Sequence, residues 1–97
     1  MAKYSVKDGQ TVLLLFQKLI SEKAQLIGSL GRGKESEHDI DIYLPNHKRT
    51  DKTVKFIYDF FEAKSFEYTD WGGVYYKDTF WGDIDVFFKG CTKDFDY

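Results

Sequence analysis

The chain has 97 residues, enough for one small domain and too few for two, so we expect a single domain over residues 1–97 with its core at about 5–89 and a tail at 90–97. Its 14 Lys and Arg residues against 16 Asp and Glu give a formal net charge of -2, which argues against a general electrostatic attraction to nucleic acid. The only cysteine, Cys91, excludes an internal disulfide, and no apolar run is long enough to cross a bilayer, so we expect a cytoplasmic protein that does not enter a membrane.

The first third of the chain predicts a helix, a strand and a short second helix. Ser5 and Asp8 match the Ser-x-x-acid pattern of a helix start, and apolar residues spaced by three and four continue the helix to about Lys23. The apolar run 24–28, which ends in glycine, predicts a buried strand, and residues 30–34 predict a short helix near an anion. The expected buried stripe of the first helix consists of Val12, Leu15, Phe16, Leu19 and Ile20.

The remaining two thirds predict four strands and one helix. The alternating residues 39–44 predict a strand that ends at Pro45. Asp51 is the expected N-cap of a helix to about Lys64, with a buried stripe of Val54, Ile57, Tyr58 and Phe61. Further strands are expected at 66–69, 74–77 and 83–88. The predicted fold is therefore α/β, of the α+β kind, with a short mixed β-sheet backed by two main helices.

Three acidic residues in the predicted strands are candidate metal ligands. Asp39 and Asp41 project to the same side because side chains alternate along a strand. Asp85 stands between Ile84 and Val86, and a carboxylate in such an apolar strand is costly unless it is paired or binds a cation. We favour Asp85 as the third ligand. Asp83, which has the same parity, stays an alternative, although its preceding glycine is typical of a strand start.

The loop between the first strand and these acids has the composition of a phosphate site. Ser29 offers a hydroxyl, and Arg32 and Lys34 supply positive charge suited to phosphate. Glycine lets a backbone approach a ligand closely, and the loop contains Gly28, Gly31 and Gly33. Beside a set of carboxylates, which suits Mg²⁺ (or Mn²⁺) better than zinc, this loop predicts a site for a nucleotide with its cation.

Four segments of the sequence together resemble the nucleotidyltransferase superfamily of DNA polymerase beta. They are Gly28-Ser29, Arg32-Gly33, Asp39-Ile-Asp41 and Ile84-Asp85-Val86. The string from Gly28 to Asp41 is especially similar to the palm of family X DNA polymerases. The resemblance implies a polymerase-beta-like palm fold, and a short chain of this kind looks like a stand-alone minimal nucleotidyltransferase.

The resemblance also assigns roles to individual residues. It implies that Asp39 and Asp41 bind two metal ions, and that Asp85 binds the catalytic ion and accepts the proton of the attacking hydroxyl. It implies that Ser29 and Arg32 hold the β- and γ-phosphates. Gly28 and Gly33 would be backbone positions of the phosphate site, with Lys34 just beyond them.

The implied reaction is transfer of a nucleoside monophosphate from an NTP, for which we expect ATP, to a hydroxyl. The acceptor could be a protein, a nucleic acid or a small molecule. Some minimal members pair with a helical protein partner, so such a partner or a homo-oligomer is expected. Two alternatives stay open: a reduced family X-like DNA polymerase palm, and a non-catalytic antitoxin or nucleotide-binding module. His38 and His47, both in predicted loops, are expected at the surface.

Overall fold

A computed structural model describes residues 4–36 and 38–91, so the expectations for residues 1–3, 37 and 92–97 lie outside the described part of the chain. It contains a five-stranded mixed sheet and three helices, which confirms the α+β class. The elements are α1 (Val6–Leu19), β1 (Gln25–Ile27), α2 (Gly28–Gly31), β2 (Ile40–Leu44), α3 (Asp51–Phe60), β3 (Ser65–Tyr68), β4 (Gly73–Thr79) and β5 (Gly82–Phe88). Within these described ranges, no helix has the length and apolar character needed to cross a membrane.

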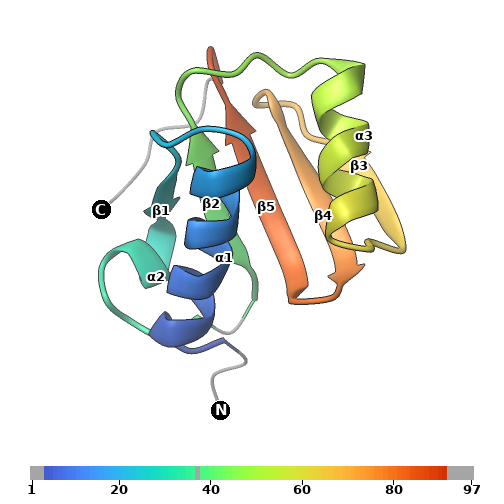
Figure 1. The fold of residues 1–97 in the computed structure, drawn as a ribbon. Coiled ribbons are helices and arrows are strands. Elements are labelled where there is room, and N and C mark those ends of the chain that lie inside the picture. Colours follow the sequence, from blue (N-terminus) through green and yellow to red (C-terminus); the bar gives the residue numbers. More distant parts are fainter. Residues whose placement is uncertain (1–3, 37, 92–97) are drawn as a thin grey trace.

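The strand order β1-β2-β5-β4-β3 places the second and the last strand side by side in the middle of the sheet. β2 and β5 run parallel, and all other neighbouring strands run antiparallel. The parallel register sets Asp41 directly beside Asp85. Figure 1 shows α1 and α3 on the same side of the sheet, α1 in front of β1 and β2 and α3 beside β3 and β4.

Helix α1 begins as predicted and ends earlier. The Ser5 side chain accepts the Asp8 amide, and the Asp8 carboxylate accepts the Ser5 amide, so the capping box is complete. The helix ends at Leu19 and not near Lys23, because the amides of both residue 20 and Ser21 donate to the Phe16 carbonyl, which closes the last turn. Leu19, predicted to be buried, is exposed.

Helix α3 also differs from its prediction at both ends. Its N-cap is Thr50, whose hydroxyl accepts the Thr53 amide, and the predicted cap Asp51 lies in the first turn. The Asp51 carboxylate instead accepts the Tyr68 hydroxyl at 3.1 Å. The helix stops at Phe60 and not near Lys64, because Glu62 adopts a φ of 54°, the left-handed conformation that commonly ends helices.

The core lies between the two long helices and the face of the sheet that they cover. The predicted stripes meet there: Phe16 of α1 stacks on Phe61 at the end of α3, with ring centroids 4.9 Å apart. The alternation of strand side chains places Ile40, Ile42 and Leu44 in this core, together with Ile84, Val86 and Phe88. The same alternation turns Asp41 and Asp85 toward the opposite face of the sheet.

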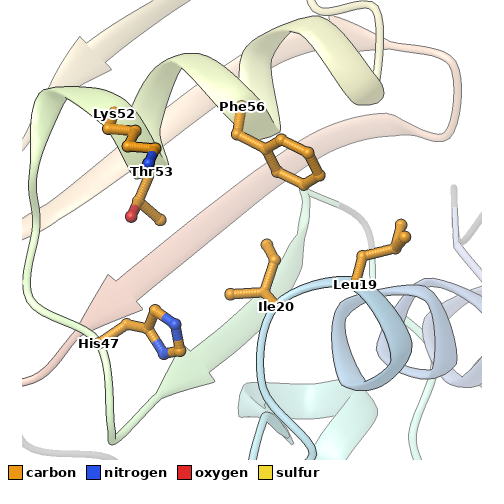
Figure 2. A pocket seen from close by; sticks show the side chains of 6 residues that line it. All are labelled: Leu19, Ile20, His47, Lys52, Thr53 and Phe56. Atoms are coloured by element: carbon orange, nitrogen blue, oxygen red, sulfur yellow. The ribbon is translucent and has the colours of Figure 1, made fainter.

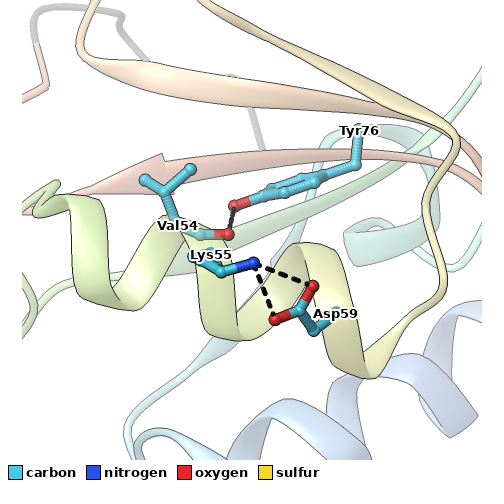
Figure 3. A network of polar contacts seen from close by, with 4 residues as sticks. All are labelled: Val54, Lys55, Asp59 and Tyr76. Atoms are coloured by element: carbon cyan, nitrogen blue, oxygen red, sulfur yellow. Dashed lines mark hydrogen bonds and ion pairs between the residues drawn. The ribbon is translucent and has the colours of Figure 1, made fainter.

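One buried polar contact ties α3 to the sheet. Figure 3 shows the hydroxyl of Tyr76, on β4, donating to the carbonyl of Val54 in the middle of α3, at 2.9 Å. Burial raises the pKa of the Tyr76 phenol, so this group stays a neutral donor. In the same view, Lys55 and Asp59 form an ion pair at 3.2 Å on the exposed side of α3, where pairs of this kind contribute little.

Replacing Tyr76 with phenylalanine is expected to lower the free energy of unfolding by about 1 kcal/mol, because it removes one buried neutral hydrogen bond and keeps the ring. Urea unfolding followed by tryptophan fluorescence measures this difference. Tyr58→Phe is the matched control, since its hydroxyl makes only an exposed 3.5 Å contact with the Lys64 carbonyl. Equal losses in the two variants would show that the contact with Val54 does not hold the helix.

Candidate metal centre and phosphate loop

The three predicted ligands Asp39, Asp41 and Asp85 meet at one place in the fold. Each offers a carboxylate oxygen, and these oxygens all lie within 4.8 Å of one another. Asp85 is buried, with 7% of its surface exposed, whereas Asp39 and Asp41 are half-buried. Three negative charges this close repel one another unless a cation or protons neutralise them. A bound cation would offset this repulsion.

The cluster arises from the parallel pairing of β2 with β5. Asp41 and Asp85 occupy neighbouring register positions on the two strands, so both side chains leave the sheet on the same side. Asp39 directly precedes β2 and has the same parity as Asp41. Asp83 does not join the cluster: one of its oxygens accepts the Asp78 amide at 3.0 Å and the other accepts the Tyr75 hydroxyl at 3.5 Å.

The donor set fits a hard divalent cation. All three ligands are carboxylates, and oxygen ligands suit Mg²⁺ or Mn²⁺. Around a single Mg²⁺, with metal–oxygen distances of about 2.0 Å, ligand oxygens stand roughly 3 to 4 Å apart. The observed separations of up to 4.8 Å are close to that spacing. The residues present can thus hold a divalent cation.

Gly28 is needed where the phosphate loop meets the cluster. It follows β1, whose last residue pairs with Asp41, and it has a φ of 69°, which favours glycine. A Cβ built on Gly28 would collide with Oδ2 of Asp41. The missing side chain therefore lets the Asp41 carboxylate lie directly against the loop backbone.

The other predicted phosphate-binding residues follow Gly28 within a few positions. Ser29 lies in α2, which spans only Gly28–Gly31 and not 30–34 as predicted, and is half-buried. Arg32, Gly33 and Lys34 come after this helix and are exposed. The Lys34 amide donates to the Ser29 carbonyl at 2.9 Å, which folds the loop back on itself. The structure thus brings Gly28 into contact with Asp41 and leaves the basic side chains of the loop, Arg32 and Lys34, at the surface.

Gly31 has a packing role. A Cβ at this position would collide with the carbonyl oxygen of Leu26, so the turn of α2 can approach β1 only with glycine here. This close approach fixes the direction in which the loop leaves the sheet.

Tyr75, which the sequence pattern did not single out, lies beside the acids. It is the register partner of Asp85 on β4, and its hydroxyl contacts Asp83. Burial first, and then the negative charges of Asp83, Asp39 and Asp85, raise the pKa of the Tyr75 phenol. The phenol therefore stays protonated and supplies a neutral hydrogen-bond donor at the edge of the cluster.

Tyr4, also missed from the sequence, holds the segment that carries Asp39. Its backbone exchanges two hydrogen bonds with Ser36, at 2.8 and 3.0 Å, and the Ser36 hydroxyl donates to the Asp39 carbonyl at 2.8 Å. The buried Tyr4 hydroxyl accepts the Asp83 amide at 2.7 Å. One tyrosine thus connects the approach to β2 with the start of β5, the two segments that carry the acids.

Gly28→Ala is expected to weaken Mn²⁺ binding by about tenfold, because the new methyl group displaces the Asp41 carboxylate. The control is Gly33→Ala, whose φ of 79° imposes similar backbone strain but whose Cβ would meet no atom within 4 Å. Backbone strain should cost both variants about 1 kcal/mol of stability, and only the first should lose affinity for the metal. Calorimetric Mn²⁺ titration separates the two, and equal affinities would show that the Gly28 contact does not matter.

The two histidines differ from each other in their surroundings. His38 is exposed, as expected from its loop position. His47, also expected at the surface, is half-buried, and its Nδ1 atom is buried with no hydrogen-bond partner among the described residues. Its turn folds back over the end of β5, where the Lys89 amide donates to the His47 carbonyl at 2.7 Å. Neither histidine belongs to the acidic cluster.

Comparisons with protein-family models, with curated proteins and with solved structures gave no match. The class of the site is therefore defined by its own geometry, as an acidic cluster able to hold a divalent cation beside a glycine-containing loop.

Proposed function

We propose that the protein is a Mg²⁺-dependent minimal nucleotidyltransferase of the superfamily of DNA polymerase beta, with a palm-like fold. It transfers a nucleoside monophosphate from an NTP, most simply ATP, to a hydroxyl. One observation carries this proposal: Asp39, Asp41 and Asp85 converge directly beside a loop that contains Gly28, Ser29 and Arg32. The convergence of residues so far apart in the chain supports the resemblance noted in the four sequence segments.

In this proposal the three aspartates hold Mg²⁺ or Mn²⁺. When bound, these ions supply the positive charge that favours an ionised attacking hydroxyl and a departing pyrophosphate. Asp85 is the residue that takes the proton from the attacking hydroxyl. Its burial on β5, a strand paired on both sides by β2 and β4, keeps it in a fixed position for this role.

The loop residues hold the triphosphate. Ser29 donates a hydroxyl hydrogen bond, and the guanidinium of Arg32 binds the β- and γ-phosphates, with Lys34 as a further positive charge. Gly28 and Gly33 contribute backbone positions. The acceptor oxygen then forms a bond to the α-phosphorus, and the bond between this phosphorus and the oxygen that bridges the α- and β-phosphates breaks. The β- and γ-phosphates leave together as pyrophosphate.

Incubation of the purified chain with each α-³²P-labelled NTP and Mg²⁺, with and without cell lysate, tests the proposal. Label transferred to a protein, nucleic acid or small molecule supports it, and the labelled species identifies the acceptor. Label added to a primer only when a template is present would instead support a reduced polymerase. Nucleotide binding without transfer under any of these conditions would contradict the proposed activity and favour a binding module.

If a protein partner is recovered together with the chain, the binding-module alternative can be tested separately. The variant Asp39→Ala, Asp41→Ala removes two of the three carboxylates. A transferase that acts on its partner should lose its effect with this variant, whereas a module that acts by covering the partner should keep it. Native gel shifts and partner activity, measured side by side, distinguish these outcomes.

A further inference from the structure

Five residues form a row across the whole sheet, on the face opposite α1 and α3, which we call the far face. Each is the register partner of the next: Ile27 on β1, Asp41 on β2, Asp85 on β5, Tyr75 on β4 and Glu67 on β3. Register partners project to the same side of a sheet, and neighbouring strands lie about 4.8 Å apart. Tyr75 therefore stands one strand beyond Asp85, on the side away from β1. Figure 1 shows the same order, with α2 next to β1 at one end of the sheet and β4 and β3 at the other.

This row gives the proposed reaction a direction. Arg32 and Lys34, which would hold phosphates in that reaction, follow α2 at the β1 end of the sheet. In phosphoryl transfer the attacking oxygen and the leaving oxygen lie roughly in line through the phosphorus. With the departing pyrophosphate toward the loop after β1, the acceptor oxygen stands on the β4 side of Asp85, where this carboxylate can take its proton. Tyr75 is the next residue of the row on that side.

The side of the sheet that the helices cover does not lead to the acids. Figure 2 shows a depression between the end of α1 and α3, with Leu19, Ile20 and Phe56 in its walls. This depression lies on the covered side, whereas Asp41 and Asp85 project to the far face, and the core of the protein fills the space between the helices and the sheet. An acceptor that meets Asp85 therefore approaches over the far face.

Tyr75 has the position and the shape of a wall for this approach. It is half-buried, and its hydroxyl contacts a carboxylate oxygen of Asp83 at 3.5 Å. The ammonium nitrogen of Lys77 lies 5.9 Å from the centroid of its ring. With the hydroxyl directed to Asp83, the ring stands beside its register partner Asp85. A partly exposed aromatic ring offers apolar area against which the carbon atoms that carry a hydroxyl can pack.

The charges beyond Asp85 do not suit a polyanion. Strands β3, β4 and β5, all of whose residues the structure describes, contain one cation, Lys77, and its ammonium lies 3.9 Å from the Glu67 carboxylate. Asp83 adds a negative charge on the same face, and Lys64, just before β3, lines a depression together with two acids. Nucleic acids are held mainly by cations that contact their phosphates. An uncharged or positively charged acceptor fits this surface better.

We propose that Tyr75 positions the acceptor, and that the acceptor hydroxyl belongs to an uncharged or positively charged molecule, a protein or a small molecule, and not to a nucleic acid. The acceptor lies over β4, packs against the Tyr75 ring and presents its oxygen to the α-phosphorus beside Asp85. The new oxygen–phosphorus bond forms as the bond to pyrophosphate breaks, and the hydroxyl proton passes to Asp85. This inference rests on the nucleotidyltransferase function proposed above, for which it names an acceptor class and a positioning residue.

Digestion of the labelled products tests the acceptor class. The full-length chain is incubated with α-³²P-ATP, Mg²⁺ and cell lysate, and label that the Asp39→Ala, Asp41→Ala variant also produces is subtracted. Label in large molecules that a protease releases and nucleases do not is expected for a protein acceptor. Label that passes an ultrafilter undigested is expected for a small acceptor, whose charge mass spectrometry and ion exchange then determine. Label released by nucleases, or carried by an anionic small acceptor, would overturn the inference and leave the transferase function intact, whereas absence of any transfer would overturn both.

Steady-state kinetics with the acceptor identified in this way test the role of Tyr75. Tyr75→Ala should raise the KM for the acceptor about tenfold and change the KM for ATP less than about twofold, because the ring touches only the acceptor. Tyr75→Phe, which keeps the ring, should stay close to the wild type. The matched control is Tyr68→Ala on β3, whose register partner Val74 lies in the core, so that Tyr68 stands on the other face of the sheet. An unchanged acceptor KM in Tyr75→Ala, or an equal rise in both KM values, would contradict the assigned role.

Discussion

Replacing Asp85 with asparagine is expected to lower the rate of nucleotide transfer by about a thousandfold or more while the protein stays folded. Asparagine has the size of aspartate, so it fits the buried position on β5, but it carries no charge and cannot take the proton of the acceptor hydroxyl. Among the described residues, Asp85 is also one of three carboxylates in the cluster, so the change should weaken the proposed metal site as well. Both effects reduce the same rate.

The stability of this variant provides a second readout. Three carboxylates whose oxygens lie within 4.8 Å repel one another, so without metal the Asp85→Asn variant should unfold at a temperature equal to or above that of the wild type. With Mg²⁺ or Mn²⁺ present, the wild type should gain stability by binding and the variant should gain less. Thermal unfolding at several metal concentrations measures this crossover.

Asp83→Asn is the control for these measurements. It removes a charge two residues away on the same strand, and its remaining carbonyl oxygen can still accept the Asp78 amide. Transfer should fall much less than with Asp85→Asn. If the two variants lost equal activity, the assignment of Asp85 as the third ligand would be wrong and Asp83 would share its role.

The largest effect on stability is expected for Phe16→Ala, with a loss of about 3 to 5 kcal/mol. Phe16 is fully buried in α1, and its ring stacks on Phe61, the C-cap residue that follows α3. A chain of this length has a total stability of roughly 5 to 15 kcal/mol, so the variant would be close to unfolding. Because this stack joins the two helices that cover the sheet, the acidic cluster should lose its order together with the core.

Leu14→Ala is the matched control on the same helix, since Leu14 is 56% exposed. Its loss should stay within about 0.5 kcal/mol. Urea unfolding followed by tryptophan fluorescence gives both values on one scale. A small loss for Phe16→Ala would show that the two helices do not depend on this stack.

Local features of the fold were largely predictable from the sequence. The Ser5 and Asp8 capping box, the stripes that contain Phe16 and Ile57, and the alternation in both central strands act over a few residues, so their spacing reveals them. Helix ends were less predictable. The end of α1 depends on the carbonyl of Phe16 accepting two amides, and the start of α3 depends on which of two adjacent polar residues turns back toward the helix.

The sequence predicted which carboxylates form the acidic cluster, and it did not predict the residues that surround them. Asp39 and Asp41 were identified because they lie on the same side of a predicted strand, and Asp85 because a carboxylate is unusual between apolar strand residues. The sequence does not state that β2 and β5 are parallel neighbours. Tyr4 and Tyr75 were missed, since an isolated tyrosine in a chain rich in aromatic residues carries no spacing signal. The buried position of His47 was missed because it depends on a turn folding over the end of β5.

Titration of the wild type and of the Asp85→Asn variant with Mn²⁺, in the presence of a non-hydrolysable NTP analogue, tests the central claim most directly. If the three aspartates form the metal centre of a nucleotidyltransferase, the wild type should bind two Mn²⁺ ions per chain with the nucleotide, and the variant should lose at least one of them. Binding of Mn²⁺ with the same stoichiometry and affinity by both proteins would contradict the account.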